Sequence, residues 1–139
     1  MAGKISAKGA VIVVDDSSGT PRTISNDVES YEIEYSVDTP EATGMNEGSH
    51  NFTPGQYIIS VTLNCFWNTT ATTGAMTVLK GIVGSTTSKT LSITPESGAT
   101  ALSGEFLCAG IMPAGDPAGN IKLGAVKFLV MGATAPTWS

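Results

Sequence analysis

Apolar and polar residues alternate through two segments in the first half of the chain, residues 28–37 and 57–67. One side of these segments is mostly aromatic and aliphatic: Tyr31, Ile33, Tyr35, Val37, Tyr57, Ile59, Val61, Leu63, Cys65 and Trp67. The other side is largely polar: Ser30, Glu32, Glu34, Ser36, Ile58, Ser60, Thr62, Asn64 and Phe66. Because successive strand residues point to opposite faces, the pattern predicts two strands that each bury one face and expose the other.

The two predicted strands are unusually long for a chain of this size. Each spans about ten residues, whereas strands in globular domains commonly run to about five or six. The segment between them, residues 38–55, is polar and contains prolines and glycines. A loop of this length inside a compact domain is uncommon unless it has a role elsewhere. We therefore predict a long hairpin over residues 28–67 that is used by something outside the subunit.

The remaining elements are shorter. A β-branched run closes the segment 4–14 and precedes a turn, and a second short strand is expected around Thr23 and Ile24. After the hairpin, apolar residues at helical spacing predict a helix over residues 71–83, with Thr or Asn as its N-cap and Gly84 after it. Strand patterns return at 90–94, 104–112 and 121–131.

The order of these elements predicts a single domain over residues 1–139 with a mainly β, α+β fold. We expect a β-sandwich or barrel of two antiparallel sheets, one flanking helix and the long hairpin. The two ends of the chain leave two alternatives open. Lys4, Lys8 and the segment 135–139 could exchange onto neighbouring subunits or be disordered.

The composition favours an assembly subunit over a nucleic-acid or membrane protein. Charged residues make up only 14% of the chain, below the usual quarter or so, while hydrophobic residues make up 41%. Assembly into a homo-oligomer would bury part of this weakly charged surface between copies of the chain. The net charge of −5 disfavours binding to phosphates, and no apolar run approaches a membrane span of roughly 20 residues. The start, MAGKISAKGA, lacks the apolar region of a secretory signal, so we expect synthesis in the cytoplasm.

Candidate chemistry is sparse. His50 is the single histidine, which rules out a multi-histidine metal site within one subunit, and Asp15 and Asp16 form a solvated turn without the calcium-loop pattern. Glu32 and Glu34 share a strand face, whereas paired catalytic carboxylates lie across a cleft. No phosphate-binding glycine motif occurs. We therefore expect no enzyme activity, no metal and no cofactor.

Two cysteines, Cys65 and Cys108, fall in strand-like apolar segments. In a chain made in the cytoplasm, the simplest interpretation is two buried, reduced thiols, and a disulfide between them is the alternative.

The hairpin region resembles the tail tube (major tail) proteins of long-tailed bacteriophages. The residues that carry the resemblance are Val37-Asp38-Thr39, Gly44, Pro54-Gly55, the alternating strand 57–67 and the helical pattern 71–83. Where a T-x-F/Y-G-D-like piece often occurs in that family, this chain has Met45-Asn46-Glu47. The resemblance implies a virion protein of the tail whose subunits form hexameric rings, stacked into a tube with an inner β-barrel that conducts DNA during ejection.

The resemblance also implies roles for particular residues and partners. The polar strand faces would line the lumen: Ser30, Glu32, Glu34, Ser36, Ser60, Thr62 and Asn64. The loop 38–55 would reach the next ring through Asp38, Glu41, Met45, Glu47, His50 and Phe52. The partners would be further copies of the chain and other tail proteins such as the tape measure and tail terminator. DNA would pass without specific binding, because carboxylates and hydroxyls do not release its counterions.

Two other classes of function fit part of the sequence. One is a different phage virion protein, such as a capsid decoration or head–tail joining subunit. The other is a carbohydrate-binding or adhesin-like β-sandwich. Carbohydrate-binding sites usually place aromatic residues in loops, whereas Trp67 lies at a strand end and Trp138 near the C-terminus.

Overall fold

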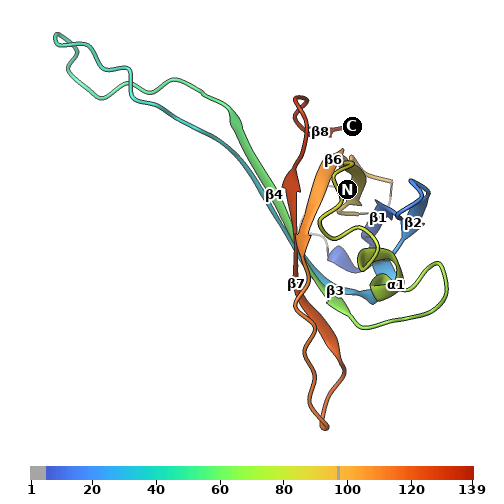
Figure 1. Ribbon diagram of the computed structural model, residues 1–139. Helices are drawn as coiled ribbons and strands as arrows, with labels where there is room; N and C mark the ends of the chain where they lie inside the picture. Colours follow the sequence, from blue (N-terminus) through green and yellow to red (C-terminus); the bar gives the residue numbers. More distant parts are fainter. Residues whose placement is uncertain (1–5, 97) are drawn as a thin grey trace.

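The chain folds into a strand-rich body from which a long two-stranded arm projects (Figure 1). The computed structural model describes residues 6–96 and 98–139. The strands are β1 (Val11–Asp15), β2 (Pro21–Thr23), β3 (Val28–Val37), β4 (Tyr57–Phe66), β5 (Lys89–Thr94), β6 (Leu102–Gly110), β7 (Lys122–Val130) and β8 (Thr137–Trp138). The helical elements are α1 (Ala75–Leu79) and two 3₁₀ turns, η1 (Ala7–Gly9) and η2 (Ser25–Asp27).

The strands form one antiparallel sheet in the order β2-β1-β5-β6-β7-β4-β3, with β8 beside β6. The predicted mainly β fold with one helix is confirmed. The sheet is continuous, however, instead of two separate sheets, because β6 belongs to both halves. Its residues from Leu102 to Phe106 pair with β5, and those from Phe106 to Gly110 pair with β7.

The core lies between the two halves of this sheet. Buried residues of β1 and β5 form a single cluster with those of β4, β7 and α1. On β4 the predicted alternation holds, since Ile59, Val61 and Leu63 are buried. On β3, Ile33 packs against the core, but Tyr35 is 40% exposed because the arm extends past the body at that point.

The predicted helix over residues 71–83 is wrong in its length, because α1 has only five residues. Gly74 has extended backbone (φ −66°, ψ 143°), and a Cβ there would lie 2.4 Å from the carbonyl oxygen of Asn68. The chain before it therefore turns back on itself instead of winding into a helix. Four of the apolar residues at helical spacing are buried nevertheless, Ala75, Val78, Leu79 and Ile82, whereas Met76 is half-buried and Val83 is exposed.

A distant carboxylate caps α1 in place of the predicted Thr or Asn. Asp27, just before β3, accepts hydrogen bonds from the backbone N–H of Ala75 at 3.1 Å and from the side-chain amide of Asn68 at 3.0 Å. An acceptor at this position satisfies one of the unpaired N–H groups that begin a helix. Asp27 thereby ties the start of β3 to the segment that follows β4.

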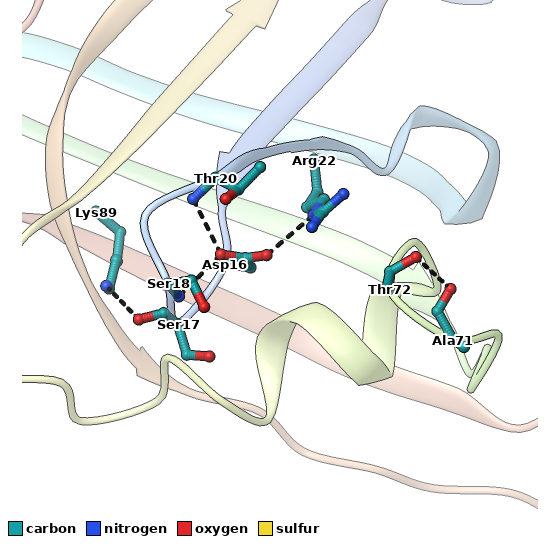
Figure 2. Close-up of polar contacts among 8 residues, drawn as sticks. All are labelled: Asp16, Ser17, Ser18, Thr20, Arg22, Ala71, Thr72 and Lys89. Carbon is teal, nitrogen blue, oxygen red and sulfur yellow. Dashed lines mark hydrogen bonds and ion pairs between the residues drawn. The ribbon is translucent and has the colours of Figure 1, made fainter.

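Asp16 organises the turn between β1 and β2 (Figure 2). Its carboxylate accepts hydrogen bonds from the backbone N–H of Thr20 at 3.0 Å, the side chain of Arg22 at 2.9 Å and the backbone N–H of Ser18 at 2.9 Å. These contacts, led by the Thr20 N–H, lower the pKa of Asp16. The expected turn is present, and the Asp16 carboxylate accepts hydrogen bonds from two of its residues, Ser18 and Thr20, and from Arg22 of β2.

Both cysteines are free and buried, as expected for reduced thiols. Burial raises the pKa of Cys65 to about 12 and that of Cys108 to about 11. At neutral pH both side chains are therefore protonated and act as core residues.

The C-terminal segment is ordered, because Thr137 and Trp138 pair with β6. At the other end, Lys8 lies in η1 and is exposed, whereas Lys4 lies outside the described residues.

We expect Leu63→Ala to lower the free energy of unfolding by about 2–5 kcal/mol, because Leu63 is fully buried and its truncation leaves a cavity. Ile58→Ala, on the exposed face of the same strand, should change it by no more than about 0.5 kcal/mol. Urea unfolding of the unassembled subunit, followed by tryptophan fluorescence, measures both. Equal losses for the two variants would contradict the assignment of the strand faces.

Candidate assembly surfaces

All seven residues predicted for the polar face lie together on the side of β3 and β4 that points away from the core. The register pairs Ser30 with Asn64, Glu32 with Thr62 and Glu34 with Ser60. The Asn64 amide donates to the Ser30 hydroxyl at 2.9 Å, and the Ser60 hydroxyl donates to Glu34 at 3.3 Å. These cross-strand contacts form a continuous hydrophilic surface, which we call the polar face.

The next strand, β7, adds a cation to the polar face that was not anticipated. Lys127 pairs with Thr62 in the ladder and is exposed between the buried Val126 and Phe128. It therefore stands in the same row as Glu32, with Thr62 between them. The alternation of residues 122–130 indicated which residues share a face with Lys127. It did not indicate which strand lies beside β4.

A second lysine lies at the end of the polar face nearest the start of β3. The Lys122 ammonium lies 3.2 Å from both carboxylate oxygens of Glu29, and 5.5 Å from the centre of the Phe66 ring. Three carboxylates and two lysines thus share this surface, counting Glu29, Glu32 and Glu34 against Lys122 and Lys127. The surface is only slightly acidic.

The outer edge of β3 is open among the described residues, since β3 ends the strand order and pairs on one side with β4. An open strand of ten residues presents a row of unpaired backbone donors and acceptors. Such an edge can accept a strand from another chain.

The loop 38–55 extends the two strands into a long projection (Figure 1). Backbone hydrogen bonds run along it from Asp38 to Gln56 at 2.8 Å, from Thr53 to Pro40 at 3.0 Å and from Ala42 to Asn51 at 2.7 Å. Glu41 and Phe52 form an isolated bridge between them. The projection is therefore a partly paired ribbon.

Glu41 joins the two sides of this projection near its tip. Its carboxylate accepts a hydrogen bond from the Thr43 hydroxyl at 2.8 Å and contacts the ring nitrogen Nδ1 of His50. The hydrogen bond from His50, followed by that from Thr43, lowers the pKa of Glu41. The Thr43 hydroxyl also accepts the backbone N–H of Asn51 at 2.8 Å.

Apolar side chains are exposed along the projection and at its base. Met45 and Phe52 are exposed, Met45 completely so. At the base, Tyr35 packs against Tyr57 with ring centres 5.7 Å apart and against Trp138 at 6.0 Å. The predicted inter-ring residues thus share one projection: Asp38, Glu41, Met45, Glu47, His50 and Phe52.

Two kinds of feature are absent from the part of the chain that the structure describes. Within residues 6–96 and 98–139, no three His, Cys, Asp or Glu side chains gather as a metal site would require. None of the described helices is long and apolar enough to cross a membrane. The features that stand out are the polar face, the open edge of β3 and the projecting loop.

These features define a class of fold, a strand-rich domain with an open sheet edge and a projecting arm. Solved structures with the same fold come from gene transfer agent particles and from the baseplate of an anti-feeding prophage. The chain aligns with a component of the tail of an empty gene transfer agent particle, refined with helical and C6 symmetry, at TM-score 0.78 and 18% identity, over 96% of this chain and 99% of that one. A component of the native gene transfer agent virion gives TM-score 0.76 and 16% identity over 96% and 99%.

A more distant match is a component of the baseplate of the anti-feeding prophage, a six-fold symmetrised structure, at TM-score 0.61 and 9% identity over 95% of both chains. No protein-family model matches the sequence, and no curated protein matches it significantly. The resemblance to tail tube proteins is therefore confirmed at the level of the fold.

Acid should loosen the tip of the projection. Because the folded loop lowers the pKa of Glu41 from its ordinary value of 4.5, its stabilising contribution is present at neutral pH and is lost as the pH falls through the lowered value. We expect the backbone amide signals of Asn51 and Phe52 to shift over this range in an NMR titration of the unassembled subunit. Glu41→Gln should remove this change in the amide signals, and Glu47→Gln should retain it. If the change survives in Glu41→Gln, another group causes it.

Proposed function

We propose that this chain is the structural subunit of a bacteriophage tail tube and is located in the virion tail. The observation that carries the proposal is the arm formed by β3 and β4, which combines a polar face, an open edge and a projecting loop on one hairpin. The fold shared with components of gene transfer agent particles supports it. A structural role accounts for the surfaces described above and needs no catalytic group.

Ring formation would use the open edge of β3. In this proposal β6, β7, β4 and β3 of each of six subunits join into one closed barrel, and every β3 edge is covered by a neighbouring subunit. Closing a sheet removes the exposed edges that otherwise promote uncontrolled pairing. Barrels of sixteen to eighteen strands already enclose a water-filled channel, so a six-subunit barrel would be wider still.

The polar face would line the channel. Double-stranded DNA carries about one negative charge per 1.7 Å, and clustered cations bind it by releasing counterions. On this face the lysines Lys122 and Lys127 are accompanied by three carboxylates. The surface would therefore neither hold DNA tightly nor repel it strongly, which suits passage during ejection without specific binding.

The loop 38–55 would connect successive rings, and the tube ends would contact other tail proteins such as the tape measure and tail terminator. The loop leaves the body along the direction of the strands (Figure 1) and carries its exposed apolar side chains beyond it. Its partly paired backbone holds Phe52 opposite Glu41 and carries Met45 in the turn at the tip. Stacking of rings thus gives the extra length of the hairpin a purpose.

Shortening the loop should abolish tubes without unfolding the subunit. Glu41 and Phe52 already pair, so residues 42–51 can be replaced by Asn-Gly, the sequence that two-residue hairpin turns prefer. We expect an unchanged circular dichroism spectrum and no tubes by negative-stain electron microscopy. The control replaces Thr86 and Thr87, in the exposed loop after α1, by glycine and should form normal tubes. Normal tubes from the shortened chain would contradict the role of the loop.

Labelling of assembled tubes tests which face lines the channel. A cysteine at Glu34 should react with small biotin-maleimide in tubes yet bind streptavidin only after the tubes are dissociated, because streptavidin is too bulky to enter the channel. Lys80→Cys, just after α1 on the core side of β4, should bind streptavidin on intact tubes. Equal streptavidin binding at both positions would place the polar face on the outside of the tube.

A further inference from the structure

The loop 38–55 and the β6–β7 hairpin lie at opposite ends of the molecule. In Figure 1 the loop reaches one extreme of the chain and the connection between β6 and β7, residues 111–121, reaches the other. The end of β4, with Trp67 after it, lies on the side of this second end. A head-to-tail repeat of the subunit along this direction, with a step that matches its length, would bring the loop of one copy near the β6–β7 end of the next.

The β6–β7 end carries a shallow apolar hollow. It has a volume of about 560 Å³ and is bordered by Trp67, Pro113, Pro117 and Ile121. Trp67 is 39% exposed and Ile121 is 49% exposed, so their apolar surface faces the hollow's open side and not the core. Exposed apolar surface that is contiguous and concave usually marks a place where another molecule binds.

The walls of the hollow are fixed by backbone hydrogen bonds. The Trp67 N–H donates to the carbonyl of Ile121 at 2.9 Å, which ties the end of β4 to the β6–β7 hairpin. Ala114 and Lys122 exchange two hydrogen bonds of 2.8 Å, and Asp116 accepts the N–H of Ala118 at 2.8 Å. A hollow held in this way is formed before any partner arrives, so binding costs little ordering of the receiving side.

The loop at the other end offers side chains that suit such a hollow. Met45 is fully exposed at its tip, and Phe52 is exposed on a bridge that the structure holds in place. Methionine is flexible enough to fill an irregular apolar hollow, and its sulfur interacts favourably with aromatic rings such as that of Trp67. The Phe52 side chain would contribute a large apolar area to the same contact.

We propose that Met45 and Phe52 of one subunit dock into the hollow of Trp67, Pro113, Pro117 and Ile121 on a second copy of the chain in the adjacent ring. This inference rests on the proposed function as a tube subunit and names the receiving surface for its loop. The contact joins two different patches of the same chain, and because stacking moves each copy along the tube axis, it leaves a free patch at each end and repeats without closing. Such a contact builds a stack of unlimited length from rings of fixed size.

Cross-linking of assembled tubes tests the contact. The double variant Met45→Cys/Ile121→Cys is treated with a short bis-maleimide, which bridges two thiols only when they lie close together. We expect a ladder of cross-linked multimers on a denaturing gel, because each subunit is joined to the next ring on both sides. The matched control, Met45→Cys/Thr87→Cys, should give no ladder. The unsubstituted chain reports any reaction of the buried Cys65 and Cys108.

The outcomes separate this inference from the proposed function. If the unsubstituted chain forms no tubes, the proposed function fails before any cross-linking is done. Tubes that give no ladder from the Met45/Ile121 pair, or an equal ladder from the Met45/Thr87 pair, overturn the docking site alone. As a second measurement, Ile121→Asp should raise the concentration needed for tube formation at least about tenfold while the circular dichroism spectrum is unchanged. An unchanged threshold would also overturn the inference.

Discussion

The two hydrogen-bonded ladders of β4 are the constraint on which the rest of the structure depends. β4 pairs with β3 along the arm and with β7 in the body, so its register positions both neighbours. Because side chains alternate along it, the same register that buries Ile59, Val61 and Leu63 also fixes which polar residues stand on the opposite side. A shift by one residue would exchange the two faces and disrupt the core and the polar face together.

Several register shifts interrupt the sheet. Two lie at the same end of the β3–β4 ladder, between Val28 and Ser30 on β3 and between Cys65 and Phe66 on β4. A third lies between Cys108 and Gly110 on β6, opposite Phe128 and Lys127 of β7. Opposite Cys65, Gly124 has φ +69°, and a Cβ there would lie 2.6 Å from the carbonyl oxygen of Met112. Bulges increase local twist and bend a strand. We therefore expect local bending of the strands at these positions.

The sequence was a good guide where the determining contacts are local and a poor one where they are not. The long hairpin could be predicted because alternation along β3 and β4 is a property of each strand alone. The length of α1 could not, because it depends on Gly74 lying against the Asn68 carbonyl and on Asp27 arriving from before β3. Lys127 was missed on the polar face for a related reason, since pairing of β7 with β4 joins segments about sixty residues apart. The pairing of β6 with both β5 and β7 could not be predicted from local patterns either, because it also joins distant segments.

The aromatic group at the base of the arm has a mechanical consequence. Trp138, held in β8 beside β6, packs on Tyr35 of the arm, and Tyr35 packs on Tyr57. The arm is thus braced by the C-terminal segment at the point where it leaves the body. A pull on the loop along the strand direction would load the β4–β7 ladder in shear, with its hydrogen bonds sharing the force, while a sideways push would be resisted by the brace. An arm built in this way resists stretching. We expect it to bend within the loop, on the side of Tyr57 away from the body.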